Sequence, residues 1–81
     1  MGVLRVMSRR GDDQIAWERE RVAVGEPEAL AAIHEAERIF QAQKARGATA
    51  FKVEKGNALS RIDQFDAEAE QVVLVPRVVG G

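Results

Sequence analysis

The residues of this chain that are best suited to chemistry are its last two glycines, Gly80 and Gly81. They follow residues 75–79, a Val-Pro-Arg-Val-Val run. Glycine has no Cβ and tolerates a wide range of φ and ψ, so a carboxyl group on two glycines can enter a channel that larger residues would block. Seven extended residues from Val75 onward reach about 23–25 Å. This ending therefore favours a reaction of the terminal carboxyl inside the active site of another protein.

The other ionisable side chains do not form a recognisable catalytic or metal-binding set. The sequence has no cysteine and one histidine, His34, so we expect no metal site. The acidic residues Asp63, Asp66, Glu68 and Glu70 are expected to form a solvated surface, with Asp66 as a cap. The sequence contains no nucleophile–base pair and no phosphate-binding loop, so we do not expect an enzyme.

Composition indicates a single folded domain. The 81 residues are 46% hydrophobic and 31% charged, and a chain of this length can bury only a small core. Twelve basic and thirteen acidic residues give a net charge of −1, so we expect no nucleic-acid partner. No apolar run approaches the roughly 20 residues of a membrane span, and the start lacks a signal-peptide core. We therefore expect no membrane partner and a cytoplasmic location.

The N-terminal third is predicted to form a β-hairpin. Residues 3–7 are apolar and rich in β-branched side chains, which favours a strand. Residues 8–14 are polar with Gly-Asp at their centre and are predicted to form the turn. Residues 15–22 begin with alternating apolar side chains and are predicted to form the second strand, with Ile15 and Trp17 on one face.

A long helix is predicted to follow the hairpin. Residues 25–28, Gly-Glu-Pro-Glu, are typical of a helix start, and Lys44, Arg46 and Gly47 are typical of a helix end. The apolar residues between them fall on one stripe: Ala29, Leu30, Ala32, Ile33, Ala36, Ile39 and Phe40. Such a helix would lie across a small sheet.

The C-terminal half is predicted to add further strands. Residues 48–55 are predicted to form a strand with Phe51 and Val53 facing the core, followed by a turn at residues 56–57. Residues 71–75 are apolar on both faces, which favours a central strand covered on one side by the helix. Residues 59–65 are predicted to be less regular, with Ile62 and Phe65 as anchors to the core. Residues 66–70 are predicted to form a single helical turn.

This order of elements favours an α+β fold of the β-grasp type. An N-terminal hairpin, one long helix packed on a mixed sheet and a late central strand would form a domain at residues 1–75, with an extended tail at residues 76–81. The preference for right-handed strand–helix–strand crossovers supports this arrangement. The alternative is another two-layer α+β domain with a different strand order.

With this order and this ending, the sequence resembles the ubiquitin-like superfamily, including its sulfur-carrier branch. The order covers the whole chain, whereas the specific match is confined to residues 71–81: an apolar strand, a proline, two hydrophobic residues and Gly-Gly. Arg77 stands four residues before the last glycine, where ubiquitin has an arginine that its activating enzyme recognises. Sulfur carriers usually have a second proline at this position, and ubiquitin has a basic residue at the position of Val79.

The resemblance implies that an activating enzyme adenylates the carboxylate of Gly81 with ATP, while the chain itself binds no cofactor. A conjugating enzyme, a protease and protein targets are implied as further partners, the product being an isopeptide bond to a target amine. Gly80 would provide steric room, and the partner would recognise Pro76, Arg77, Val78 and Val79. Trp17 is open to two interpretations, a core residue under the helix or a contact for a partner. The candidate acceptor lysines are Lys44, Lys52 and Lys55.

Two alternatives remain open at this level. A sulfur carrier would share the adenylation of Gly81 but would end as a thiocarboxylate. A non-covalent binding or structural module would instead use its sheet edge or the face around Trp17, and its tail would be passive.

Overall fold

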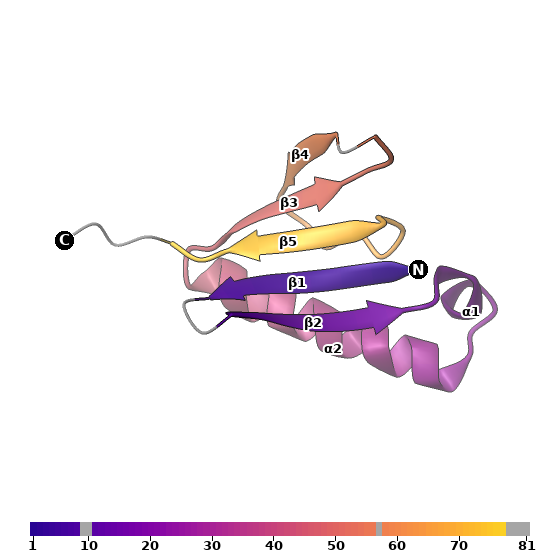
Figure 1. The fold of residues 1–81 in the computed structure, drawn as a ribbon. Coiled ribbons are helices and arrows are strands. Elements are labelled where there is room, and N and C mark those ends of the chain that lie inside the picture. The colour runs from indigo at the N-terminus through magenta and orange to yellow at the C-terminus, as the bar shows by residue number, and fades with distance from the viewer. Residues whose placement is uncertain (9–10, 57, 78–81) are drawn as a thin grey trace.

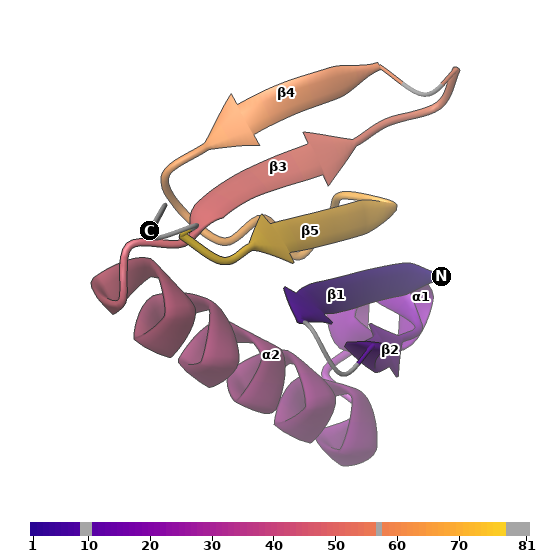
Figure 2. The same cartoon turned by 60° about the vertical axis from the view of Figure 1, so that its left-hand side comes forward.

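The computed structural model describes residues 1–8, 11–56 and 58–77, and the chain forms five strands and two helices along these ranges (Figure 1). The elements in chain order are β1 (Gly2–Ser8), β2 (Gly11–Trp17), α1 (Arg19–Ala23), α2 (Pro27–Ala45), β3 (Thr49–Val53), β4 (Leu59–Ile62) and β5 (Gln71–Val75). The strands form one mixed sheet in the order β2-β1-β5-β3-β4. The long helix α2 covers one face of this sheet (Figure 2).

The last strand, β5, lies at the centre of the sheet, as the sequence predicts. It runs parallel to β1, with Leu4 opposite Val72, and antiparallel to β3, with Ala50 opposite Leu74. All four of these side chains are fully buried. An α+β fold with an N-terminal hairpin and one long helix on a mixed sheet is thus confirmed.

The second strand of the hairpin differs from its predicted range of residues 15–22. It begins at Gly11, directly opposite Ser8, whose Oγ donates a hydrogen bond of 2.7 Å to the Gly11 carbonyl. It ends at Trp17, and α1 replaces its predicted second half. Two physical reasons account for this. An edge strand tolerates polar side chains, and the Arg-Glu-Arg segment of α1 consists of good helix formers.

The predicted helix is confirmed over Pro27–Ala45. Its predicted apolar stripe supplies the buried residues Ala29, Ile33, Ala36 and Phe40. The helix is followed by Gly47 in a left-handed conformation, with φ of +94°, as its predicted capping role requires.

The predicted orientation of β3 is wrong. Ala50 faces the helix and is fully buried, whereas Phe51 pairs with Val73 on the opposite face of the sheet, and Val53 lies on that face as well. Alternation along a strand fixes which residues share a face but not which face meets the helix. The small side chain of Ala50 occupies the side covered by α2.

The segment before β5 is more regular at its start than predicted. Residues 59–62 form the short edge strand β4, whereas an irregular segment is predicted there. Ile62 and Phe65 pack against the core, as predicted. Residues 66–70 form turns and bends in place of a helical turn, and the Asp66 carboxylate accepts a hydrogen bond of 3.0 Å from the Glu68 N–H.

Across the described ranges, neither helix combines the length and the apolar character that a membrane crossing requires.

Candidate functional site

The C-terminal segment leaves the molecule from the end of the central strand. Val75 pairs with Thr49 of β3, and the exposed residues Pro76 and Arg77 follow without further strand structure. Figure 1 shows this exit at the end of the sheet where α2 also ends. Residues 78–81, which include the predicted reactive glycines, lie outside the described residues.

Arg77 packs against the turn that ends α2. A Cβ atom added to Gly47 would lie 3.1 Å from Cδ of Arg77 and 3.6 Å from its Cβ. The turn itself is closed by main-chain hydrogen bonds, from the Gly47 N–H to the Lys44 carbonyl at 2.9 Å and from the Ala48 N–H to the Gln43 carbonyl at 3.0 Å. The absence of a side chain at Gly47 therefore lets the Arg77 stem lie close to the helix end.

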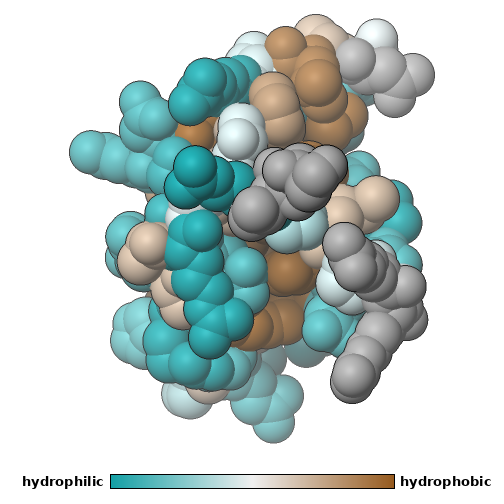
Figure 3. Space-filling view, turned by 90° about the vertical axis from the view of Figure 1, so that its left-hand side faces the viewer, coloured by the Kyte–Doolittle hydropathy of each residue, from teal (hydrophilic) through white to brown (hydrophobic). Residues whose placement is uncertain are grey.

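This end of the molecule carries two arginines beside the tail. A shallow hollow of about 340 Å³ is lined by Gln43, Arg46, Ala48, Pro76 and Arg77. The C-terminus of a helix has a partial negative charge that favours cations nearby. Figure 3 looks onto this end, where hydrophilic side chains cover one side and hydrophobic surface is visible beside them. Residues 43–48 and Arg77 together form what we call the tail base.

The three candidate acceptor lysines differ in their surroundings. The Lys44 amine lies 3.6 Å from the Asp63 carboxylate, and its side chain is 23% exposed. The Lys52 amine lies 3.5 Å from both Glu54 and Asp66, and its side chain is 31% exposed. Lys55 is exposed in the turn after β3 and forms no ion pair with another described residue. Of the three amines, that of Lys55 is the most accessible to a reacting partner.

Trp17 is a core residue and is only 3% exposed. Its Nε1 donates a hydrogen bond of 3.0 Å to the Ala67 carbonyl, and its ring packs edge-on against Phe65 with centroids 5.6 Å apart. A Cβ atom on Gly2 would collide with the indole ring. The expectation of a core residue under the helix is therefore confirmed, whereas a contact of Trp17 with a partner stays a prediction.

The sheet face opposite α2, which we call the open face, has a hydrophobic centre. The strand registers place on it Val3, Arg5 and Met7 of β1, Asp12, Gln14 and Ala16 of β2, Gln71, Val73 and Val75 of β5, Thr49, Phe51 and Val53 of β3, and Leu59 and Arg61 of β4. Leu59 is 63% exposed. Phe51, Val53 and Val73 are only partly buried and do not belong to the core beneath the helix. An uncovered apolar surface of this kind is typical of a contact site.

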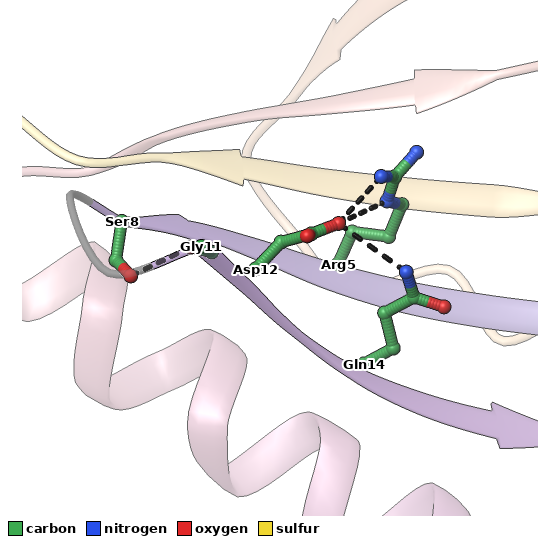
Figure 4. Close-up of polar contacts among 5 residues, drawn as sticks. All are labelled: Arg5, Ser8, Gly11, Asp12 and Gln14. Atoms are coloured by element: carbon green, nitrogen blue, oxygen red, sulfur yellow. Dashed lines mark hydrogen bonds and ion pairs between the residues drawn. The ribbon is translucent and has the colours of Figure 1, made fainter.

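One side of the open face carries a polar network (Figure 4). Arg5 donates two hydrogen bonds to the Asp12 carboxylate, of 2.9 Å from Nε and 2.5 Å from Nη2, and the Gln14 amide donates a third at 3.2 Å. These hydrogen bonds, that of Arg5 above all, lower the pKa of Asp12 below its ordinary value. The network is exposed, so it shapes the charge of the open face more than its stability.

Among the described residues, no group of three His, Asp or Glu side chains is arranged to hold a metal ion. His34 lies exposed on α2.

The contact between Gly47 and Arg77 and the apolar open face were not foreseen from the sequence. The first joins residues thirty positions apart, and only the pairing of β3 with β5 brings them together. The second follows from the orientation of Phe51, for which the alternating small residues Ala48 and Ala50 are the available signal.

Comparisons of the chain with protein-family models, curated proteins and solved structures returned no match.

Proposed function

We propose that this chain is a ubiquitin-like β-grasp protein whose Gly81 carboxylate is adenylated by an activating enzyme and transferred to a target amine. The observation that carries the proposal is the Gly80-Gly81 ending on a segment that continues the central strand. Gly81 would be the reacting residue either as the natural end or after trimming by a protease. The expected compartment is the cytoplasm, where ATP is available to the activating enzyme.

The strand order and the tail base support this proposal. A mixed sheet in the order β2-β1-β5-β3-β4 under one long helix is compatible with a β-grasp domain. The stem of Arg77 lies against the Gly47 turn, where the tail begins. A partner could therefore recognise Arg77 together with Arg46 before the carboxyl enters its active site.

The proposed chemistry places every reactive group other than the carboxylate in the partners. A Gly81 carboxylate oxygen attacks the α-phosphorus of ATP, and pyrophosphate leaves. A partner thiolate then attacks the acyl carbon and AMP leaves, which gives a thioester. The target amine forms the new C–N bond, loses a proton, and the thiolate leaves. The chain contributes only the carboxyl, its freedom of approach and the residues that are recognised.

The test uses the protein tagged at its N-terminus in the native host and purified under denaturing conditions. Wild type is compared with a variant that lacks Gly81, and an Arg61→Ala variant serves as a surface control outside the tail base. We expect higher-mass conjugates from wild type and Arg61→Ala and none without Gly81. Conjugates that persist without Gly81 would refute the mechanism.

The same experiment separates the sulfur-carrier alternative. A carrier would show the mass change of one oxygen replaced by sulfur on the C-terminal peptide, and no conjugates. Both functions share the adenylation step and differ in the nucleophile that attacks the acyl-adenylate.

A non-covalent binding module is a second candidate, favoured by the apolar open face. Its centre at Phe51 and Val73 would be buried by a partner, while the tail would play no part. Phe51→Ser would then abolish function and removal of Gly81 would not, which is the opposite of the result expected for a conjugated modifier.

A further inference from the structure

β2 is an edge strand whose one neighbour among the described strands is β1, so the main-chain groups along its outer edge have no strand partner within the described residues. The Val3 N–H donates to the Glu70 carbonyl at 3.1 Å, so the main-chain groups of Val3 point toward β5. Since these groups alternate along a strand, the residues next to Val3 bond to β2. The antiparallel register then leaves three residues of β2 with N–H and C=O groups directed away from the sheet: Asp12, Gln14 and Ala16.

A hollow of about 180 Å³ lies beside this edge, between β2 and the N-terminal half of α2. Its apolar lining consists of Ala16 and Trp17 of the strand and of Ala29 and Ala32 of the helix. The two helix residues carry only methyl groups, so their side chains do not fill the space next to the strand. Figures 1 and 2 show the N-terminal part of α2 running alongside β2.

The rim of this hollow is acidic. Glu18, Glu26 and Glu28 line it together with one cation, Arg21. The Arg21 guanidinium is already paired with Glu26, at 3.4 Å. The rim therefore attracts positive charge.

We propose that the edge of β2 and this hollow bind an extended segment of a partner protein, apolar at its centre and flanked by lysine or arginine. The segment would add a strand to the sheet through the outward groups of Gln14 and Ala16. One apolar side chain would enter the hollow above Trp17, and the flanking cations would lie near Glu18 and Glu28. The other edge strand, β4, has four residues against seven in β2 and offers a shorter template. This site uses no residue of the tail and does not depend on the proposed carboxyl transfer.

The probe is the capped peptide Lys-Val-Ile-Val-Lys, titrated into the full chain. Binding is followed by amide NMR shifts and by the fluorescence of Trp17, the only tryptophan. We expect shifts concentrated on β2 and the start of α2, and a change in Trp17 emission. Glu-Val-Ile-Val-Glu should bind about threefold or more weakly, because two exposed charge pairs become repulsive. Lys-Val-Pro-Val-Lys should not bind, because proline cannot donate to the edge.

Two matched pairs of variants locate the site. Glu28→Gln should weaken binding of the basic peptide about twofold or more, whereas Glu37→Gln, which removes the same charge from the opposite side of α2, should not. Ala32→Leu should block the hollow, whereas Ala42→Leu, exposed on the same helix, should leave binding unchanged.

Several outcomes would overturn the proposal: no binding of the basic peptide, equal binding of both charged peptides, or shifts centred on Phe51 and Val73. Self-association through β2 without peptide would identify a second copy as the occupant and would equally contradict it. Deletion of Gly81 should leave peptide binding unchanged, so failure here is distinguishable from failure of the carboxyl-transfer proposal.

Discussion

At the scale of single residues, the structure separates side chains that are held in place from side chains that are available. Trp17 is held by a hydrogen bond to the Ala67 carbonyl and by Phe65. Lys44 and Lys52 are restrained by carboxylates, whereas Lys55 is not paired within the described part of the chain. From the sequence, all three lysines are equally good candidate acceptors, because residue type does not show which amines form ion pairs in the folded protein.

The Asp12 carboxylate provides a prediction at this scale. Hydrogen bonds from Arg5 and Gln14 lower the pKa of Asp12 below its ordinary value, so the contact stabilises the fold at pH values above the pKa of this carboxyl group in the unfolded chain. That contribution is lost as pH falls through the folded pKa. Arg5→Gln should raise the pKa of Asp12 toward its ordinary value, as measured by NMR titration of the carboxyl carbon. Arg61→Gln, on the same face at the far edge, should leave it unchanged. An unaltered pKa in Arg5→Gln would contradict the geometry of Figure 4.

At the scale of elements, the decisive feature is which face of β3 meets the helix. Fully buried Phe40 and partly buried Phe51 provide a matched pair of aromatic residues. Phe40→Ala should lower the free energy of unfolding by about 3–5 kcal/mol, because it opens a cavity under the helix. Phe51→Ala should cost clearly less, because its side chain lies on the open face. Urea denaturation measures both, and equal losses would place Phe51 in the core after all.

The turn after α2 yields a second prediction at this scale. Gly47 and Gly25 both have positive φ, of +94° and +76°, so replacement of either by alanine should cost about 1–2 kcal/mol of stability. Only at Gly47 does the new methyl group meet a neighbour, the stem of Arg77. Gly47→Ala should therefore also shift the Arg77 side-chain NMR signals and reduce conjugate formation, while Gly25→Ala should do neither. Identical behaviour of the two variants would exclude a role for the Gly47–Arg77 contact.

The sequence predicted the elements with a strong internal signal and failed where tertiary context decides. The apolar stripe of α2 and the continuous apolar run of β5 could be predicted, because the first pattern is typical of a helix on a sheet and the second of a central strand. The polar residues of β2 suggest a turn until the sheet makes them an edge strand, and residues 19–22 become helical without an apolar pattern. The tail base could not be predicted, because it depends on the register between β3 and β5.

At the scale of the whole molecule, the tail base and the β2 hollow lie at opposite ends of α2. A helix of 19 residues spans about 28 Å, so a segment bound at the hollow would not obstruct the tail base. The two sites can therefore be occupied together, and a segment bound at β2 would leave the tail base free for the proposed activating enzyme. The exposed open face is available to a further contact.

The central claim is that the Gly81 carboxyl becomes activated, and chemical trapping tests it most directly. The N-terminally tagged protein is incubated in an extract of its native host with hydroxylamine and either ATP or its α,β-methylene analogue, which cannot be cleaved to an adenylate and pyrophosphate. Mass spectrometry of the C-terminal peptide is the measurement. We expect a hydroxamate on Gly81 with ATP and none with the analogue, whether the later acceptor is an amine or sulfur. A free carboxyl in both samples would contradict the account.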